Sequence, residues 1–311
     1  MEAGEDMSAY KARLVASHIE SLLAARAAGY SAVRRGESTG GKSTGGKSTG
    51  RPLFVGMQGP QGSGKTTTTA AVQQRLASRG RTSAVFSLDD LYLRHADLVA
   101  VAKAHPANAL LQGRGQPGTH DVELGTSLLR SLARINDQAD GNGSEGASKG
   151  DGSSVVHLPC FDKSLHAGQG DRAPSTTSVR APLDVVIVEG WCMGFVARDP
   201  AELSRHYRQL LSTSSASASS SSPSSSSAPS LPSQSSSPSY TARHPLESLL
   251  EINERLRGYA EAWYGDIDAF VQLRPVRLDD VFAWRLEAER AMRAQGKGAM
   301  SDDEVHDFVA R

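Results

Sequence analysis

The chain has 311 residues, and its 34 basic and 34 acidic side chains give a formal net charge of zero. This balance argues against long-range attraction to nucleic acid or to a membrane surface and favours a small-molecule partner. Two cysteines are too few for a disulfide framework, and no apolar run approaches the roughly 20 residues of a membrane-spanning helix. The N-terminal sequence resembles neither a signal peptide nor a transit peptide, so we expect a cytoplasmic protein, or an organellar one if the N-terminus is incomplete.

Three stretches of the chain are poor material for a hydrophobic core. Residues 36–51 repeat the letters STGGK, residues 137–154 are rich in Gly, Ser and Asp, and residues 212–239 are almost entirely Ser with scattered Pro and Ala. Such segments bury too little apolar surface to offset the entropy lost on ordering, so we expect disordered low-complexity segments. The remaining roughly 250 residues suit a single α/β domain, preceded by a helical segment over 1–35.

The first predicted element is an amphipathic helix over residues 8–28 that serves packing rather than chemistry. The STGGK repeat behind it matches the phosphate-binding pattern G-x-x-x-x-G-K-[ST] twice, at 36–43 and at 41–48. Neither match has an apolar strand before it or a helix-forming sequence behind it, so nothing would hold the backbone amides in a concave array. We interpret both as chance matches within a linker over 36–51.

A third match to the same pattern stands in a better context. Residues 52–57 predict a buried strand, the loop GPQGSGKT follows, and residues 67–79 predict a helix. Glycines let the loop amides surround a phosphate, the helix N-terminus adds positive potential, Lys65 reaches the outer phosphates, and Thr66 offers a hydroxyl to Mg²⁺. The residues expected to contact ATP are Gly59, Pro60, Gln61, Gly62, Ser63, Gly64, Lys65, Thr66 and Thr67.

The next strand, predicted over 82–88, ends at Asp89 and Asp90 and completes a strand–helix–strand unit of a parallel sheet. The run LDVVIV over 183–188 ends at Glu189 and is typical of a central parallel strand. The remaining predicted elements are helices at 97–104, 124–135, 246–261 and 278–293, strands at 155–158 and 269–273, and a Gly/Pro-rich loop at 112–119. The predicted fold class is therefore α/β, a P-loop NTPase fold with a parallel sheet flanked by helices and with low-complexity inserts.

Acidic side chains and the glycine-rich loop are expected to meet where the parallel strands end. Asp89 is the candidate for the group that orients the attacking hydroxyl and accepts its proton, while Thr66, Asp90 and Glu189 are the candidate magnesium ligands. Lys65 and Glu189 are counted with Asp89 as catalytic residues. The alternatives are that Asp89 and Asp90 cap or begin a helix, and that Glu189 pairs with a basic neighbour.

The chain resembles the D-glycerate 3-kinase family of plants and fungi, including its yeast ATP-binding kinase-like relatives. The resemblance rests on GPQGSGKTT, SLDDLYL, LLQGRGQPGTHD, FDKSLHAGQGDR, VVIVEGW, INERLRGYAEAW and WRLEAERAMRAQGKGAMSDDEV, and covers most of residues 52–311 outside the inserts. It implies that 52–311 is a P-loop kinase domain related to phosphoribulokinase and uridine kinase. It further implies Mg²⁺-dependent transfer of phosphate from ATP to D-glycerate, with Asp89 of Asp-Asp-Leu-Tyr activating the hydroxyl.

A carboxylate-bearing acceptor needs fixed cations or amide donors around it. The candidate substrate-binding residues are Arg114, His120, Asp121, Lys163, His166 and Arg172, with the two arginines foremost because a guanidinium can bind a carboxylate through two hydrogen bonds. The alternative for each is loop solubility or local pairing with Asp121 or Asp171. Residues 166–172 are glycine-rich and are where we expect a closing movement.

Several other side chains near these motifs have simpler interpretations. Arg285, Arg290 and Arg293 are expected on a solvated, salt-bridged helix face, with a phosphate-contacting role left open for Arg285. Cys192 lies near Glu189, but no neighbouring His supports nucleophilic catalysis. Two alternatives for the function also stay open: a related kinase acting on a nucleoside, pantothenate or another small alcohol, and a nucleotide-binding regulator with weak ATPase activity.

Overall fold

The computed structural model describes residues 6–29, 50–137, 154–218, 240–277, 279–294, 296 and 300–310. Both chance matches to the phosphate-binding pattern, most of the insert at 137–154 and residues 219–239 of the Ser-rich tract lie outside the described residues. The expectations for those segments therefore stay predictions. Within the part of the chain that is described, no helix has the length and apolar character needed to cross a lipid bilayer.

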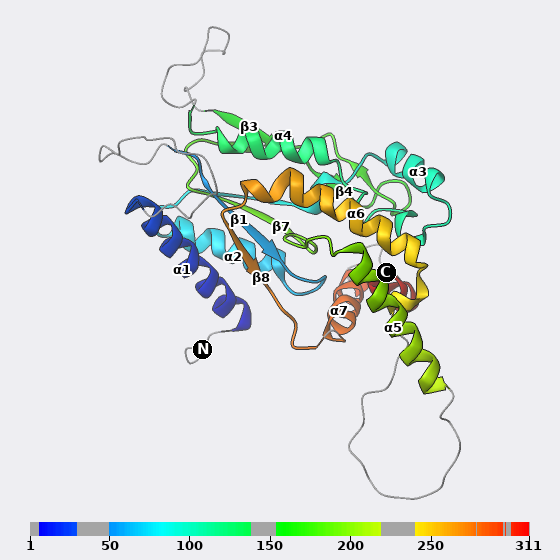
Figure 1. The fold of residues 1–311 in the computed structure, drawn as a ribbon. Coiled ribbons are helices and arrows are strands. Elements are labelled where there is room, and N and C mark those ends of the chain that lie inside the picture. Colours follow the sequence, from blue (N-terminus) through cyan, green and yellow to red (C-terminus); the bar gives the residue numbers. More distant parts are fainter. Residues whose placement is uncertain are drawn as a thin grey trace, which may run out of the picture.

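Four parallel strands form the central sheet (Figure 1). Their order across the sheet is β2 (Ser83–Ser87), β7 (Val185–Gly190), β1 (Leu53–Gln58) and β8 (Ala269–Gln272). Both β1 and β7 are buried along their whole length, as expected for strands covered on two faces. Because all four strands run in one direction, their carboxyl ends share one edge, and the parallel sheet predicted from the sequence is confirmed.

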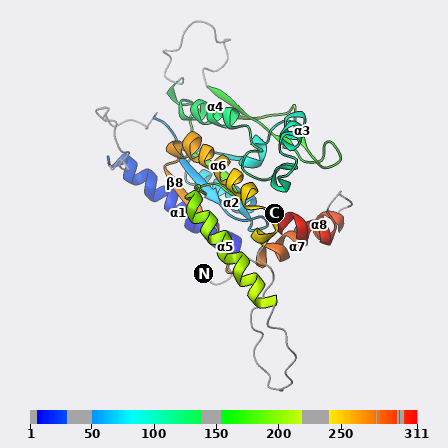
Figure 2. The same ribbon diagram turned by 45° about the vertical axis from the view of Figure 1, so that its right-hand side comes forward.

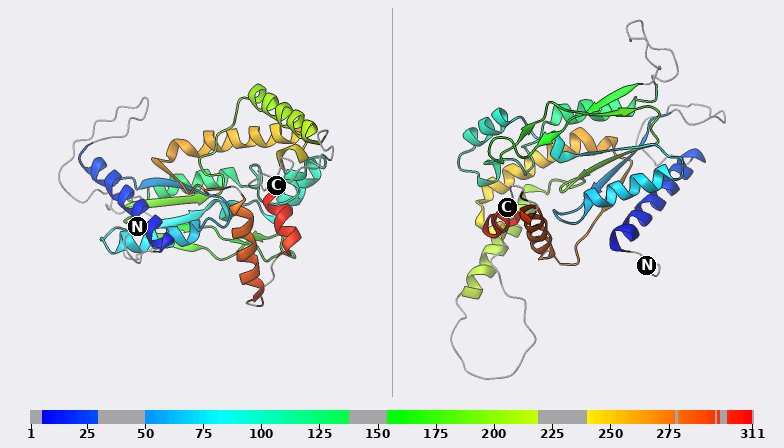
Figure 3. Two further views of the ribbon diagram at one scale, coloured as in Figure 1. Left: turned by 90° about the horizontal axis from the view of Figure 1, so that it is seen from below. Right: turned by 180° about the vertical axis from the view of Figure 1, so that it is seen from behind.

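One face of the sheet is covered by α1 (Met7–Ala27) and α2 (Lys65–Ala77), which lie side by side in Figure 3. Alternate residues of the strands point to this face and form one apolar cluster with the two helices. Ile19 of α1 is fully buried in this cluster, and burial of such a side chain contributes about 1.5–3 kcal/mol. The N-terminal helix is therefore part of the same hydrophobic core as the sheet.

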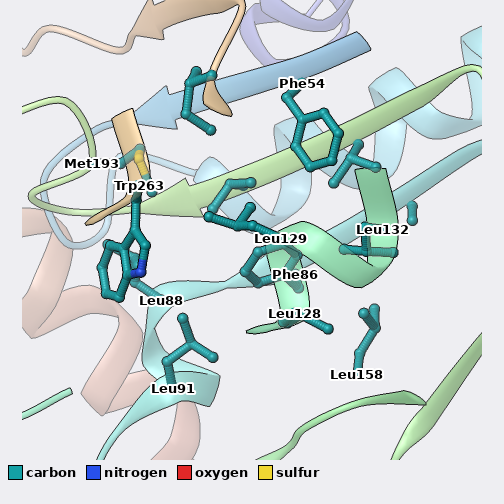
Figure 4. Close-up of a cluster of buried hydrophobic side chains, with 14 of the residues drawn as sticks. Phe54, Phe86, Leu88, Leu91, Leu128, Leu129, Leu132, Leu158, Met193 and Trp263 are labelled. Carbon is teal, nitrogen blue, oxygen red and sulfur yellow. The ribbon is translucent and has the colours of Figure 1, made fainter. Parts of the chain in front are cut away.

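The opposite face is covered by α4 (Val122–Ala133) and α6 (Leu246–Trp263). Phe54 and Phe86 point from the strands into this second cluster, where Leu128, Leu132 and Trp263 meet them (Figure 4). The alternation along each strand explains why neighbouring apolar residues divide between two cores. The helices predicted over 124–135 and 246–261 are thus confirmed, with small shifts of their ends.

Shorter elements surround this three-layer core. The helical ones are η1 (Leu88–Leu91), α3 (His95–Ala104), η2 (Ala109–Leu111), η4 (Tyr240–Arg243) and η5 (Tyr264–Asp266). Two antiparallel pairs join β3 (Val155–Leu158) to β6 (Thr177–Arg180) and β4 (Phe161–Asp162) to β5 (Asp171–Arg172). The strand predicted at 155–158 therefore exists, but it lies outside the central sheet because its partner is β6.

The C-terminal part of the domain adds α7 (Asp280–Ala294) and α8 (Asp302–Ala310), which pack against each other near the C-terminus in Figure 2. Arg290 and Arg293 both pair with Asp302, so the predicted salt-bridged face is confirmed for these two arginines. Arg285 differs, because it pairs with Glu289, whose side chain is almost fully buried.

One expectation is corrected by α5 (Pro200–Ala218). The Ser-rich tract was predicted to be disordered from residue 212, but the helix continues to Ala218. The side chain of Asp199 accepts hydrogen bonds from the first amides of the helix, at Ala201 and Glu202. Once a helix has begun, each added residue costs little, and the Ala and Ser residues here allow it to continue for two turns beyond its amphipathic part.

Candidate active site at the strand ends

The phosphate loop, residues 59–66, connects the end of β1 to the start of α2. Gly62 and Gly64 have φ angles of 76° and 81°, which other residues rarely adopt. A Cβ atom on Gly62 would lie 2.6 Å from the Cβ atom of Trp284 in α7. The loop therefore needs glycine at position 62 both for its backbone conformation and for close contact with the C-terminal helix.

Lys65 folds back over this loop and donates hydrogen bonds to the carbonyl oxygens of Gly59 (2.7 Å) and Pro60 (3.1 Å). Burial lowers the pKa of Lys65, and the charges of Glu189 and Asp89 oppose this effect. The buried hydroxyl of Ser63 has no hydrogen-bond partner among the described residues. A charged amine whose hydrogen bonds within the described residues go to carbonyls, beside a hydroxyl with no partner there, is well suited to receive an anion.

Asp89 follows β2 in the short helix η1, and its carboxylate is contacted at both oxygens. Oδ1 accepts a hydrogen bond from the Tyr92 hydroxyl (3.2 Å) and Oδ2 one from Lys163 Nζ (2.5 Å). Burial would raise the pKa of Asp89, but the charge and hydrogen bond of Lys163 bring that pKa below its usual value. Ser87, not Asp89, caps the short helix, so Asp89 is an ionised first-turn carboxylate beside the phosphate loop.

Glu189 is the second-last residue of β7, and the sheet register aligns it with Met57 of β1 and Ser87 of β2. Burial raises the pKa of Glu189, while the charge of Lys65 and a hydrogen bond from Ser87 oppose the increase. Lys65 exerts the largest charge effect on Glu189, which supports the alternative that Glu189 pairs with a basic neighbour.

Asp90, Thr66 and Glu189 were the predicted magnesium ligands. Asp90 Oδ1 accepts a hydrogen bond from the Phe161 amide (3.1 Å), so this carboxylate anchors β4, while Thr66 is exposed at the start of α2. The described residues contain no cluster of three metal-ligating His, Cys, Asp or Glu side chains. Oxygen donors without a complete protein cage fit Mg²⁺, which is typically bound by one or two side chains together with phosphates and water.

A pocket of about 220 Å³ lies next to the phosphate loop. Its lining comes from the phosphate loop, residues 113–116, Trp191, and the C-terminal helices. The Trp191 indole donates a hydrogen bond to the Gly115 carbonyl (2.9 Å), and this bond ties the Gly-rich loop to the end of β7. The contributions of Val281 and Val309 to the pocket were missed from the sequence, since an isolated valine in a helix carries no functional signal.

Arg114 is the cation that lines this pocket. Its Nη1 donates to the carbonyl of Gly168 (2.6 Å) and to that of Gln169, and its guanidinium lies 5.9 Å from the ring centre of Phe161. Among the described residues, no carboxylate lies within ion-pairing distance of Arg114. The side chain thus bridges the loops 112–119 and 163–170, and its other nitrogen atoms form no hydrogen bond within the described part of the chain.

Arg172 and Asp121 were both predicted to bind substrate, and the structure pairs them with each other at 3.0 Å. Arg172 also donates to the Tyr92 carbonyl (3.1 Å), while Asp121 caps α4 by accepting from the Leu124 amide (2.9 Å). These contacts match the alternative of local ion pairing. They join β5 to the start of α4 and to the backbone at Tyr92.

His120 is buried and stacks on Tyr92 with a ring separation of 4.4 Å. Its Nδ1 lies 2.7 Å from the hydroxyl of Tyr259, which also accepts the Gly118 amide (2.8 Å). Burial lowers the pKa of His120 to about 4, so this imidazole is neutral at physiological pH. It therefore brings no positive charge to an acceptor carboxylate, contrary to the reason for which it was singled out.

His166 stacks on His95 at 3.8 Å and contacts Asp171 Oδ2 at 3.2 Å. Together with Ala167 it has a positive φ angle, in the loop between β4 and β5. These contacts bring His166 to α3 rather than to Asp89.

Burial raises the pKa of the Cys192 thiol to about 12, which agrees with the expectation that Cys192 is no nucleophile.

Comparisons with known proteins identify relatives of this chain. The chain is 32% identical over 262 residues to the chloroplastic D-glycerate 3-kinase of Arabidopsis thaliana, covering 84% of this chain and 46% of the plant protein. It is 33% identical over 263 residues to an uncharacterised kinase of Schizosaccharomyces pombe, covering 83% of this chain and 78% of the fungal protein. The chain thus spans about half the length of the plant relative and most of the fungal one.

A solved structure supports the same relationship. The D-glycerate 3-kinase of Cryptococcus neoformans matches with a TM-score of 0.74 and 31% identity, over 96% of this chain and 84% of that one. A scan against models of known protein families finds no match.

Proposed function

Because the chain belongs to the family of P-loop kinases that includes D-glycerate 3-kinase, we propose that it transfers the terminal phosphoryl group of ATP to D-glycerate, producing 3-phosphoglycerate. The observation that carries this proposal is the ionised Asp89 carboxylate after β2, next to a phosphate loop whose Lys65 donates to two carbonyl oxygens of the loop itself. A base and a phosphate cradle at adjoining strand ends are the two parts that a kinase needs.

In the proposed mechanism, Lys65 and the loop amides bind the outer phosphates, and Lys65 leaves the carbonyls of Gly59 and Pro60 to do so. Asp89 accepts a hydrogen bond from the acceptor hydroxyl and takes its proton as the new oxygen–phosphorus bond forms. Thr66 and Glu189 would hold Mg²⁺, which neutralises phosphate charge when bound. Asp90 stays engaged with the Phe161 amide and contributes charge from further away.

The acceptor is proposed to be a small hydroxy acid because of Arg114. This cation lines a pocket of about 220 Å³ with no carboxylate partner among the described residues, so its unused N–H groups are available to a substrate carboxylate. Arg172 supports the site indirectly, since Asp121 already neutralises it.

A coupled assay of ADP release tests this proposal, with D-glycerate, L-glycerate, uridine and pantothenate as acceptors and with product identified by mass. We expect D-glycerate to give the highest kcat/KM by at least tenfold. A preference for uridine or pantothenate would assign the chain to a different acceptor within the same family. Slow ADP release that no acceptor stimulates would favour the nucleotide-binding regulator instead.

A further inference from the structure

Lys163 occupies the oxygen of Asp89 that a substrate would need. Its Nζ lies 2.5 Å from Oδ2, and the other oxygen of Asp89 is engaged by Tyr92. A general base must hydrogen-bond the hydroxyl that it deprotonates, and both carboxylate oxygens of Asp89 already have partners. Each carboxylate oxygen can accept two hydrogen bonds, so an acceptor hydroxyl would either join Lys163 on Oδ2 or displace it.

The surroundings of Lys163 indicate where its amine can go. Electrostatic effects link it to Lys65 and Glu189 as well as to Asp89, so its charge lies among the groups facing the phosphate loop. Bringing two ammonium groups close together is unfavourable unless an anion lies between them. The outer phosphates of ATP would supply more negative charge than the single carboxylate of Asp89.

The local backbone allows such a movement without unfolding. Asp162 pairs with Asp171 in the β4–β5 ladder, and its side chain accepts hydrogen bonds from the amide (2.9 Å) and hydroxyl (2.6 Å) of Ser164. These contacts fix the backbone on both sides of Lys163. The side chain itself is 54% exposed, so a change of rotamer is enough to redirect its amine.

We propose that Lys163 is a catalytic residue whose amine leaves Asp89 and binds the phosphoryl group while that group is transferred. This inference rests on the proposed kinase function. In the resting enzyme its amine neutralises Asp89. When ATP binds, the amine moves to an oxygen of the terminal phosphate, and the acceptor hydroxyl then takes its place on Oδ2.

The chemical step then balances without a further reactant. The acceptor oxygen forms a bond to the terminal phosphorus atom, the bond from that phosphorus to the bridging oxygen breaks, and ADP carries away the electron pair. The hydroxyl proton passes to Asp89 and later to solvent. Lys163 keeps its proton throughout and stabilises the negative charge on the phosphoryl oxygens, which a group fixed on Asp89 could not do.

This role differs from the substrate-carboxylate contact predicted for Lys163 from the sequence, and the two roles separate in steady-state kinetics. For Lys163→Met we expect kcat to fall about 10²–10³-fold, with less than a threefold change in the KM of the acceptor. Lys163→Arg should recover part of the loss because it keeps the charge. Lys103→Met, which removes an exposed lysine at the end of α3, is the matched control and should leave both constants unchanged.

A binding experiment gives a readout that needs no acceptor. Titration calorimetry with Mg²⁺ should show that Lys163→Met weakens a non-hydrolysable ATP analogue about three- to tenfold and leaves ADP affinity unchanged, because only the analogue carries a terminal phosphate. Equal affinities of wild type and Lys163→Met for the analogue would overturn the proposal. So would a loss confined to the KM of the acceptor, which would assign Lys163 to the acceptor carboxylate.

The failure of this inference is distinguishable from failure of the proposed function. If wild type ignores D-glycerate but phosphorylates another alcohol in the panel, the same kinetic comparison is run with that alcohol. If no acceptor is found, the difference between analogue and ADP binding decides the role of Lys163 by itself.

Discussion

The phosphate loop and the proposed acceptor side of the site, residues 112–121 and 161–172, are built by different means. The conformation of the phosphate loop is determined by its backbone. Glycines at positions 62 and 64 allow its positive φ angles, and Lys65 donates to a carbonyl oxygen of the loop itself. The acceptor side is set by side chains that join segments far apart in the sequence, such as Arg172 with Asp121. A local sequence motif can therefore predict the phosphate loop, whereas the contacts of residues 112–121 and 161–172 can be identified only from the folded structure.

Asp89 stands between the two regions, and its replacement should give the largest effect. Asp89→Asn removes the proton acceptor while keeping the size of the side chain, so we expect kcat to fall about 10²–10⁴-fold. The affinity for ATP should change little, because the phosphate loop is left intact. Single-turnover kinetics together with equilibrium ATP binding measure the two quantities, and turnover close to that of wild type would remove Asp89 from the mechanism.

Arg114 tests the acceptor side alone. Arg114→Met keeps much of the apolar stem and removes the charge, and we expect kcat/KM for D-glycerate to fall about 10–100-fold, in line with losing a charged hydrogen bond of 1.5–3 kcal/mol. ATP affinity should stay the same. Arg205→Met, on the exposed surface of α5, is the matched control. An effect of Arg114→Met on ATP affinity alone would place this arginine in the nucleotide site.

His120 gives the proposed acceptor side a pH dependence between pH 5 and pH 7.5. Its pKa in the folded protein is about 4, below the value of about 6.5 in the unfolded chain, so the unfolded state binds a proton more readily between these values. Stability therefore falls as the pH falls through this range, and His120 accounts for about 2 kcal/mol of the loss between pH 7.5 and pH 5. Chemical denaturation at both pH values should show a smaller loss in His120→Asn; an equal loss would mean that His120 is charged in the folded protein.

Gly62 tests the backbone-built region. Gly62→Ala must adopt a positive φ angle at a cost of about 1–2 kcal/mol and must displace Trp284, so we expect ATP affinity to fall about tenfold. The matched control is Gly80→Ala, which has a similar φ angle of 73° but open space around it. Both variants should lose stability, and only Gly62→Ala should lose ATP affinity. Equal ATP affinities in the two variants would contradict a special role for Gly62.

The smallest effect is expected from the repeats that imitate the phosphate loop. Lys42→Ala and Lys47→Ala should leave ATP affinity and turnover unchanged, whereas Lys65→Ala should abolish measurable ATP binding. Titration with a fluorescent ATP analogue compares the three variants directly. Weaker binding in either repeat variant would show that the pattern alone, without the strand and helix around it, can contribute to the nucleotide site.

The elements with strong local patterns could be predicted from the sequence. The apolar runs of β1 and β7 are continuous because both faces of these strands are buried, and the glycine-rich loop marks the start of α2 within two residues. Because the strands are parallel, carboxylates that follow the strands are expected at the same edge of the sheet. Asp89 and Glu189 could thus be placed at a shared edge before any contact was known.

The rest depended on partners that a linear pattern does not reveal. His120 and Arg172 were both candidates for an acceptor carboxylate, but Tyr259, 139 residues later, contacts the buried His120, and Asp121 neutralises Arg172. The strand β3 could not be assigned to its own hairpin because nothing in its four residues identifies β6 as the neighbour. The persistence of α5 into the Ser-rich tract was missed because composition was weighed above helix propagation.

The strand order has a consequence for how the chain folds. Although β1 and β2 are separated by only one helix in the sequence, β7 lies between them in the sheet, so neither can complete its pairing until residue 190 is available. Contacts of this separation in sequence slow folding, because a long loop must close before they form. During synthesis, the sheet that supports the phosphate loop therefore cannot form until β7, more than a hundred residues later in the chain, has left the ribosome.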